Sequence, residues 1–128
     1  MEKTVSDERQ LLKCAYSEFN ARNIDAVLAL LHPEVEWANG MEGGHVHGKE
    51  AVRAYWTRQF GMLDPHVEPV RIGRMSDGRF LVEVQQVVHD LKGNLLVDTV
   101  VYHTYRIRNG LIERMDIARE KPANAAIF

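Results

Sequence analysis

The sequence has a single cysteine, Cys14, among its 128 residues, so no disulfide can form within the chain. Cys14 falls in a helical pattern, which predicts a buried structural thiol, and the expected location is the reducing cytoplasm. No apolar run approaches the roughly 20 residues of a membrane-spanning helix. The first ten residues are charged where a secretory signal would be apolar. Export and membrane insertion are therefore not expected.

A strong net charge is also lacking. Sixteen Lys and Arg residues against 18 Asp and Glu residues leave a net charge of -2, and basic residues alternate with acidic ones instead of gathering beside aromatics. The sequence therefore predicts no partner nucleic acid. It also has no glycine-rich phosphate loop, no serine in a nucleophile-elbow pattern and no cysteine cluster. With 45% hydrophobic residues, the chain fits one domain spanning residues 1–128.

Helical periodicity dominates the first half of the chain. Apolar residues recur at helical spacing in residues 6–23, 24–31 and 48–60. The second of these helices should end before Pro33, because the residue that precedes a proline resists the α conformation. Between the second and third helices, the alternation in residues 34–40 predicts a strand with Val35, Trp37 and Asn39 on one face.

From residue 67 onward the period changes to two. Residues 67–75, 79–90, 95–108 and 111–120 alternate between apolar and polar and are separated by short turn sequences. This series predicts an antiparallel meander. Three N-terminal helices followed by a curved, mainly antiparallel sheet make an α+β domain in which the helices cover one sheet face. Its core is expected at about residues 7–120, with a loosely held tail at 121–128.

The order of these elements, with the stretches "NARNIDAVLALLHPEVEW", "HGKEAVRAYW" and "YRIRNGLIERMDI", resembles the SnoaL-like branch of the nuclear transport factor 2-like (NTF2-like) superfamily. The resemblance implies a cone-shaped fold that encloses a pocket between the helices and the concave sheet face, and a homodimer through the outer sheet face. The superfamily includes polyketide cyclases, ketosteroid isomerases, scytalone dehydratases, epoxide hydrolases and many non-catalytic modules. The fold alone therefore does not select an activity.

The Asn-Gly pair at residues 109–110 allows the register of the last hairpin to be counted. In a two-residue type I′ turn both central residues take positive φ, and the flanking Arg108 and Leu111 are directly opposed. Counting back by twos places His103 opposite Asp116, close enough for a hydrogen bond between imidazole and carboxylate. A β-bulge would slip this register by one residue and move Asp116 to the other face.

The preceding hairpin indicates which sheet face is buried. If four residues form its loop, Asp90 pairs with Leu95 and His103 lies opposite Val82, in the more apolar phase of both strands. Such a wall, apolar with a few convergent polar groups, is typical of a small-molecule pocket. The predicted lining is Val82, Gln86, Thr99, Val101, His103, Tyr105, Arg114 and Asp116 from the sheet, Trp37 and Asn39 from the first strand, and Tyr16, Tyr55 and Trp56 from the helices.

This arrangement leads to a catalytic hypothesis. If Asp116 accepts a hydrogen bond from one ring nitrogen of His103, it raises the imidazole pKa and leaves the other nitrogen to remove a proton from a ligand. In SnoaL-like cyclases an aspartate acts as the acid/base on an enolisable polyketide, and the resemblance implies Asp116 for that role. Trp37 stands where ketosteroid isomerases carry their aspartate base, which argues against that activity. We expect a cofactor-independent isomerase, cyclase or dehydratase acting on a small hydrophobic cyclic or polyketide-like substrate.

A non-catalytic alternative remains open. His103, Asp116 and Arg114 can instead form a satisfied polar cluster that only supports the sheet, and aromatic residues at helical spacing often belong to a core. The protein would then be a module that binds a small ligand or a protein partner and dimerises through the outer sheet face. His45 and His47 have an H-x-H spacing but no third ligand close in sequence, so a loop rimming the pocket mouth is favoured over a metal site.

Overall fold

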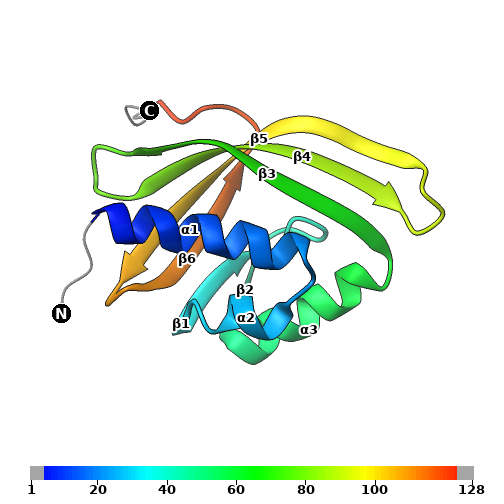
Figure 1. Ribbon diagram of the computed structural model, residues 1–128, viewed down its shortest axis with the longest axis horizontal. Helices are drawn as coiled ribbons and strands as arrows, with labels where there is room; N and C mark the ends of the chain where they lie inside the picture. The colour runs from blue at the N-terminus through cyan, green and yellow to red at the C-terminus, as the bar shows by residue number, and fades with distance from the viewer. Residues whose placement is uncertain (1–4, 124–128) are drawn as a thin grey trace.

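The computed structural model describes the backbone of residues 5–123 and the side chains of residues 7–123. In chain order the elements are α1 (Val5–Asn20), α2 (Ile24–Leu28), β1 (Leu31–Ala38), β2 (His45–His47), α3 (Lys49–Phe60), β3 (Leu63–Arg74), β4 (Phe80–Asp90), β5 (Leu95–Arg108) and β6 (Leu111–Ala118). The helices lie on one side of a curved sheet (Figure 1). Most of the predicted tail, residues 124–128, lies outside the described residues.

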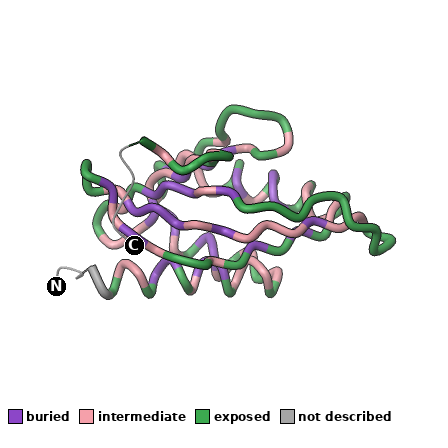
Figure 2. The backbone as a smooth tube through the Cα atoms, turned by 90° about the horizontal axis from the view of Figure 1, so that it is seen from above, coloured by how far each residue is buried: buried purple, intermediate pink, exposed green. Residues whose placement is uncertain are grey.

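The six strands form one open sheet in the order β2-β1-β6-β5-β4-β3. All neighbours are antiparallel except β1 and β6, which run parallel. The predicted α+β class with a curved, mainly antiparallel sheet is therefore confirmed. Buried positions concentrate where helices and strands face each other, and the tip of the β4–β5 hairpin extends beyond the helices into solvent (Figure 2). No helix among residues 5–123 is long and apolar enough to cross a membrane.

Several element boundaries differ from those predicted. The second helix ends at Leu28, and β1 begins at Leu31, so Pro33 lies inside a strand. Pro33 is tolerated there because the adjoining pairing with β6 is irregular between Leu31 and Glu36. Likewise β3 begins at Leu63, four residues before the predicted strand. Pro65 lies inside β3, opposite Val88, and is tolerated because β3 is an edge strand of the sheet. In neither segment does the proline mark the end of the element.

The β4–β5 register agrees with the count made from the sequence. His103 lies opposite Val82, and the pairs Val84–Val101 and Gln86–Thr99 follow the same register. Four residues, 91–94, separate the two strands as predicted. The predicted pairing of Asp90 with Leu95 is wrong, because the register shifts after Val88 and brings His89 opposite Leu95. The Asp90 carboxylate instead accepts hydrogen bonds of 2.9 Å from the backbone N–H groups of Lys92 and Asn94, and so stabilises the turn.

The β5–β6 hairpin begins as predicted and then departs from the count. Asn109 and Gly110 have φ angles of 53° and 76°, as a type I′ turn requires, and Arg108 opposes Leu111. The register then shifts by one residue at Glu113, so that Arg106 pairs with Arg114 and Thr104 pairs with Asp116. The prediction that His103 faces Asp116 is therefore wrong.

The physical reason for this bulge lies in the spacing of the apolar residues of β6. Ile112 and Met115 are three residues apart, yet both are in the core, with exposures of 0% and 2%. Regular alternation would point Met115 to the outer face and bury the charges of Arg114 and Asp116 among apolar side chains, at a cost of several kcal/mol. The extra residue, Glu113, lets Ile112 and Met115 both face inward.

Candidate functional site

A cavity of about 370 Å³ lies between the helices and the sheet. Side chains from α1, α2, α3 and five of the strands form its wall, which is predominantly aromatic and aliphatic. Seven of the predicted lining residues border it, namely Tyr16, Trp37, Tyr55, Trp56, Gln86, His103 and Tyr105. Their positions agree with the prediction of a pocket on this face of the sheet, and their functional roles stay predictions.

Other predicted lining residues lie elsewhere. Val82 and Val101 are on the correct face but are covered by the core, and Thr99 lies on the exposed part of β5. Asn39 follows the last residue of β1, and its side-chain oxygen accepts hydrogen bonds from the backbone N–H groups of Met41 and Glu42 at 3.0 and 2.8 Å. Asn39 is therefore a turn-stabilising residue and not a pocket residue.

Arg114 and Asp116 are displaced to the outer sheet face by the bulge. Arg114 Nε donates to Asp116 at 2.9 Å, and the other carboxylate oxygen lies 2.8 Å from Nε2 of His45. Partial burial opposes ionisation of Asp116, but the hydrogen bonds from Arg114 and His45 outweigh it and lower the pKa of this carboxyl group. Asp116 is an ion-paired carboxylate remote from His103, and the predicted dyad does not exist.

His45 and His47 lie in strand β2, not in a loop that rims the pocket. His47 contacts two carboxylates of β1: Nδ1 is 2.7 Å from Glu36, and Nε2 is 3.3 Å from Glu34. Within residues 5–123 no group of three or more histidine, cysteine, aspartate or glutamate side chains is arranged to hold a metal ion. The side chains of His45 and His47 therefore link the short β2 strand to carboxylates of β6 and β1.

The sequence pattern also missed several residues that border the cavity. Met115 and Ile117 face inward because of the bulge, and the three-residue spacing of Ile112 and Met115 is the signal that could have revealed them. Gly40 and Met41 contribute from the β1–β2 loop, whose position is fixed by a 3.1 Å hydrogen bond from the Gly40 N–H to the Tyr55 hydroxyl. A loop position of this kind has no periodic signal in the sequence.

The polar centre of the cavity is His103. Nδ1 of its ring lies 2.8 Å from the Tyr16 hydroxyl, and the Tyr105 hydroxyl donates to Tyr16 at 2.7 Å. The Tyr16 and His103 rings are stacked, with centroids 5.8 Å apart and planes 11° from parallel. Burial lowers the pKa of His103 to about 4 and raises the pKa of both tyrosines. The imidazole is therefore neutral at physiological pH.

The hydrogen-bond chain selects one tautomer of this neutral ring. With Tyr105 donating to Tyr16 and Tyr16 donating to Nδ1, every buried hydroxyl hydrogen has an acceptor. Nδ1 then carries no proton, and the ring hydrogen sits on Nε2. Nε2 has no hydrogen-bond partner among the described residues. Every fully buried side-chain nitrogen or oxygen in this part of the chain has a partner, so Nε2 is not fully buried. Nε2–H therefore borders the cavity as an available donor.

Aromatic rings form the wall around this donor. Trp37 packs edge-on against Trp56, with centroids 5.2 Å apart and planes at 90°, and its ring lies 6.3 Å from that of Tyr105. None of the described residues that border the cavity is an aspartate, glutamate, lysine or arginine. The cavity thus combines flat apolar walls with one neutral donor, and it offers no fixed charge to a ligand.

Comparisons with known proteins agree with this architecture. A family model described as a SnoaL-like domain matches residues 13–115. No curated protein sequence matches the chain. An NTF2-like protein of unknown function from Burkholderia pseudomallei has 23% identity and a TM-score of 0.77, with 89% of this chain and 91% of that chain covered. TerC, crystallised with polyporic acid, has the same identity and TM-score over 89% and 92% of the two chains. A putative polyketide cyclase from Pseudomonas putida has 21% identity and a TM-score of 0.74 over 86% and 89%.

Proposed function

Because the chain belongs to the SnoaL-like domain family, we propose that its cavity binds a small, mainly apolar, ring-containing molecule that offers an oxygen acceptor to His103. The observation that carries this proposal is the neutral imidazole whose Nε2–H borders an aromatic cavity without a partner. The Nε2–H group can donate a hydrogen bond to water in the free protein. A ligand that fills the cavity without an acceptor for this group would lose that hydrogen bond and gain none in return. Co-crystallisation of the similarly folded TerC with polyporic acid supports small-molecule binding as the use of the fold.

The proposed activity is a cofactor-independent isomerisation or cyclisation at a carbonyl group. A hydrogen bond from Nε2–H draws electron density to the carbonyl oxygen, which makes the carbonyl carbon more electrophilic and the neighbouring C–H more acidic. In a cyclisation, the enol carbon of the same molecule forms the new C–C bond to that carbon. The carbonyl oxygen becomes a hydroxyl and takes up the proton that the enol oxygen releases. His103 keeps its proton throughout and acts as an electrophilic donor.

A second candidate function is binding without turnover. It is favoured by the absence of any carboxylate among the described residues that border the cavity, because removal of a carbon-bound proton normally needs a base within reach. Under this candidate the chain sequesters or senses the same class of ligand. Under the first candidate the substrate must be acidic enough, as a 1,3-dicarbonyl chain is, to enolise with water as the base.

One experiment tests binding and distinguishes the two candidates. Affinity for 2-tetralone is compared with affinity for tetralin, which has the same ring system without the oxygen, by calorimetry on the wild type and on His103→Phe. One neutral hydrogen bond predicts about a tenfold preference for the ketone that the variant loses. Cyclisation of a linear 1,3-dicarbonyl chain above the uncatalysed rate, lost in His103→Phe, supports the enzyme, and binding of that chain without turnover supports the second candidate. Equal affinity for 2-tetralone and tetralin contradicts the proposal.

A homodimer through the outer sheet face also belongs to the proposal. Val100 faces outward on β5, opposite Gln85 of β4, and is 38% exposed in the single chain. An apolar side chain in the middle of a long strand is a natural centre for such an interface. Light scattering should give twice the mass of the chain for the wild type and the mass of one chain for Val100→Lys. A wild-type mass of one chain contradicts the dimer.

A further inference from the structure

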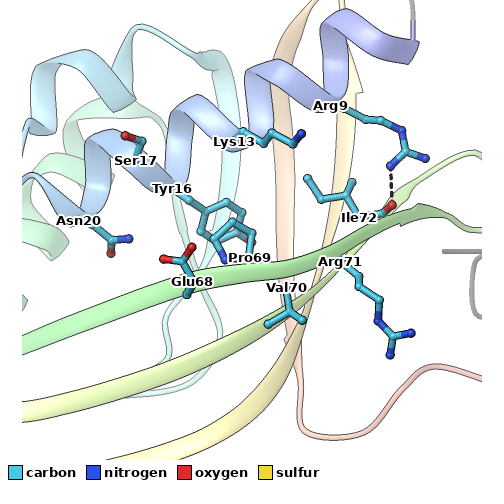
Figure 3. A pocket seen from close by; sticks show the side chains of 10 residues that line it. All are labelled: Arg9, Lys13, Tyr16, Ser17, Asn20, Glu68, Pro69, Val70, Arg71 and Ile72. Atoms are coloured by element: carbon cyan, nitrogen blue, oxygen red, sulfur yellow. Dashed lines mark hydrogen bonds between the residues drawn. The ribbon is translucent and has the colours of Figure 1, made fainter.

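A second hollow, of about 660 Å³, lies between α1 and β3 (Figure 3). Among the described residues, Tyr16 alone borders both this groove and the aromatic cavity. The groove is therefore a separate space that has one wall residue in common with the cavity. It is also the larger of the two, and the function proposed above makes no use of it.

Local structure explains why α1 and β3 stand apart here. The α1 side of the groove is one helical face, because its members recur at intervals of three and four residues. On the other side, the pairing of β3 with β4 shifts between Pro69 and Arg71, which leaves Val70 as the extra residue of a bulge. A bulge bends its strand, and Val70 is 52% exposed as a result. The groove is thus a consequence of the backbone path.

The cations of the groove gather at one end. Nη1 of Arg9 donates to the backbone carbonyl of Ile72, and the guanidinium lies 5.8 Å from the centre of the Phe80 ring, so the position of the Arg9 side chain is fixed. Lys13 follows one turn later on the same face and has no ion pair or hydrogen bond among the described residues. Its side chain extends toward the end where Arg9 lies (Figure 3).

The other charged residues of the groove do not neutralise Arg9 and Lys13. Glu68, the one carboxylate among the described lining residues, lies toward the end marked by Asn20 and is 3.4 Å from His66. Arg71 points away from α1 (Figure 3) and forms an ion pair of 2.9 Å with Glu83. The Arg9 end therefore carries two positive charges, and the compensating carboxylate is at the opposite end.

Between the two ends the floor is apolar, formed by Tyr16, Pro69 and Ile72. The groove follows α1 from Arg9 to Asn20, which at 1.5 Å per residue is roughly 16 Å. We propose that this groove is a second ligand site for an elongated amphipathic carboxylate, whose anionic head binds Arg9 and Lys13 and whose apolar chain lies along Ile72, Pro69 and the Tyr16 ring. Arg9 supplies a planar, already positioned donor pair, and Lys13 supplies a mobile point charge.

Three probes of related structure test both halves of this proposal. Decanoate carries the head and the chain, decanol the chain without the charge, and acetate the head without the chain. We expect calorimetry to give an affinity for decanoate at least tenfold above that for either of the others. Backbone amide signals of Lys13 and Ser17 should shift on titration, while those of Met41 and Ile117 at the aromatic cavity should not. Shifts confined to the cavity would overturn the proposal.

Variants locate the site without disturbing the core. Lys13→Gln should weaken decanoate binding at least fivefold, because Lys13 is exposed and its ammonium group has no structural partner. Lys92→Gln, which removes the same charge from the exposed β4–β5 turn, is the matched control and should leave the affinity unchanged. Ser17→Trp fills the groove from an exposed position and should abolish binding. Equal losses in Lys13→Gln and Lys92→Gln, or full binding by Ser17→Trp, would contradict a site in the groove.

Discussion

The Tyr16 hydroxyl lies 2.8 Å from Nδ1 of His103, and the two rings are stacked 5.8 Å apart although 87 positions separate them in sequence. This contact joins the first helix to the centre of the sheet. The Tyr16 hydroxyl occupies Nδ1 of the imidazole, and Nε2 borders the cavity. The chemistry available to a ligand is therefore set by a helix residue that contributes no charge.

Removing the Tyr105 hydroxyl tests whether the hydrogen bonds from Tyr105 to Tyr16 and from Tyr16 to His103 select the tautomer of the His103 ring. In Tyr105→Phe, Tyr16 loses a buried donor but still contacts Nδ1 of His103. We expect a loss of about 1 kcal/mol in the free energy of unfolding, measured in urea. The ¹⁵N shifts of the His103 ring should report a mixture of tautomers in the variant and one tautomer in the wild type. A single unchanged tautomer in Tyr105→Phe would show that Tyr105 does not set it.

Stability should fall in mild acid because of His103. Its pKa is lowered to about 4 from an ordinary value of 6.5, so the unfolded state binds the proton more readily. The stabilisation is present in full above about pH 6.5 and is lost progressively as the pH falls toward 4, with a total of roughly 3 kcal/mol. Unfolding free energies across this range should decline in the wild type and much less in His103→Phe. His89→Gln, which removes a histidine near the hairpin tip, should keep the wild-type slope.

Asp116→Asn should behave as an outer-face change. It removes the charge that pairs with Arg114 and His45, both partly exposed, so we expect a loss of at most about 1 kcal/mol in unfolding free energy. Affinity for a cavity ligand such as 2-tetralone should not change, whereas His103→Phe should lower it. A strong loss of binding in a folded Asp116→Asn protein would place this carboxylate back in the site.

The opposite pH dependence should be seen at β2. The hydrogen bond to Glu36, together with the charges of Glu36 and Glu34, raises the pKa of His47. Its contribution to stability is therefore present in full below about pH 6.5 and is lost as the pH rises through the raised value. An NMR titration of the His47 ring should give a pKa above 6.5, and Glu36→Gln should return it toward that value. An unperturbed wild-type titration would show that the contact does not persist in solution.

Much of the fold was predictable because local rules and tertiary demands agree. The period changes from helical to alternating near residue 67, and the Asn109-Gly110 turn has the positive φ angles that its sequence predicts. The β4–β5 register followed from the match of two apolar phases. Boundaries near Pro33 and Pro65 were misplaced, since irregular or edge pairing accepts a residue that regular pairing would exclude.

Part of the candidate site was also predictable from the sequence, and part of it was not. The sequence by itself determined that aromatic residues and His103 occupy the inward phase, because burial of apolar side chains fixes which face of each element turns to the core. Only the tertiary structure decided the partner of His103. The bulge at Glu113 moved Asp116 to the outer face so that Met115 could be buried, and helix packing brought Tyr16 to Nδ1 in its place. Alternation fixes faces, but a partner depends on register and on contacts between distant segments, which local patterns do not encode.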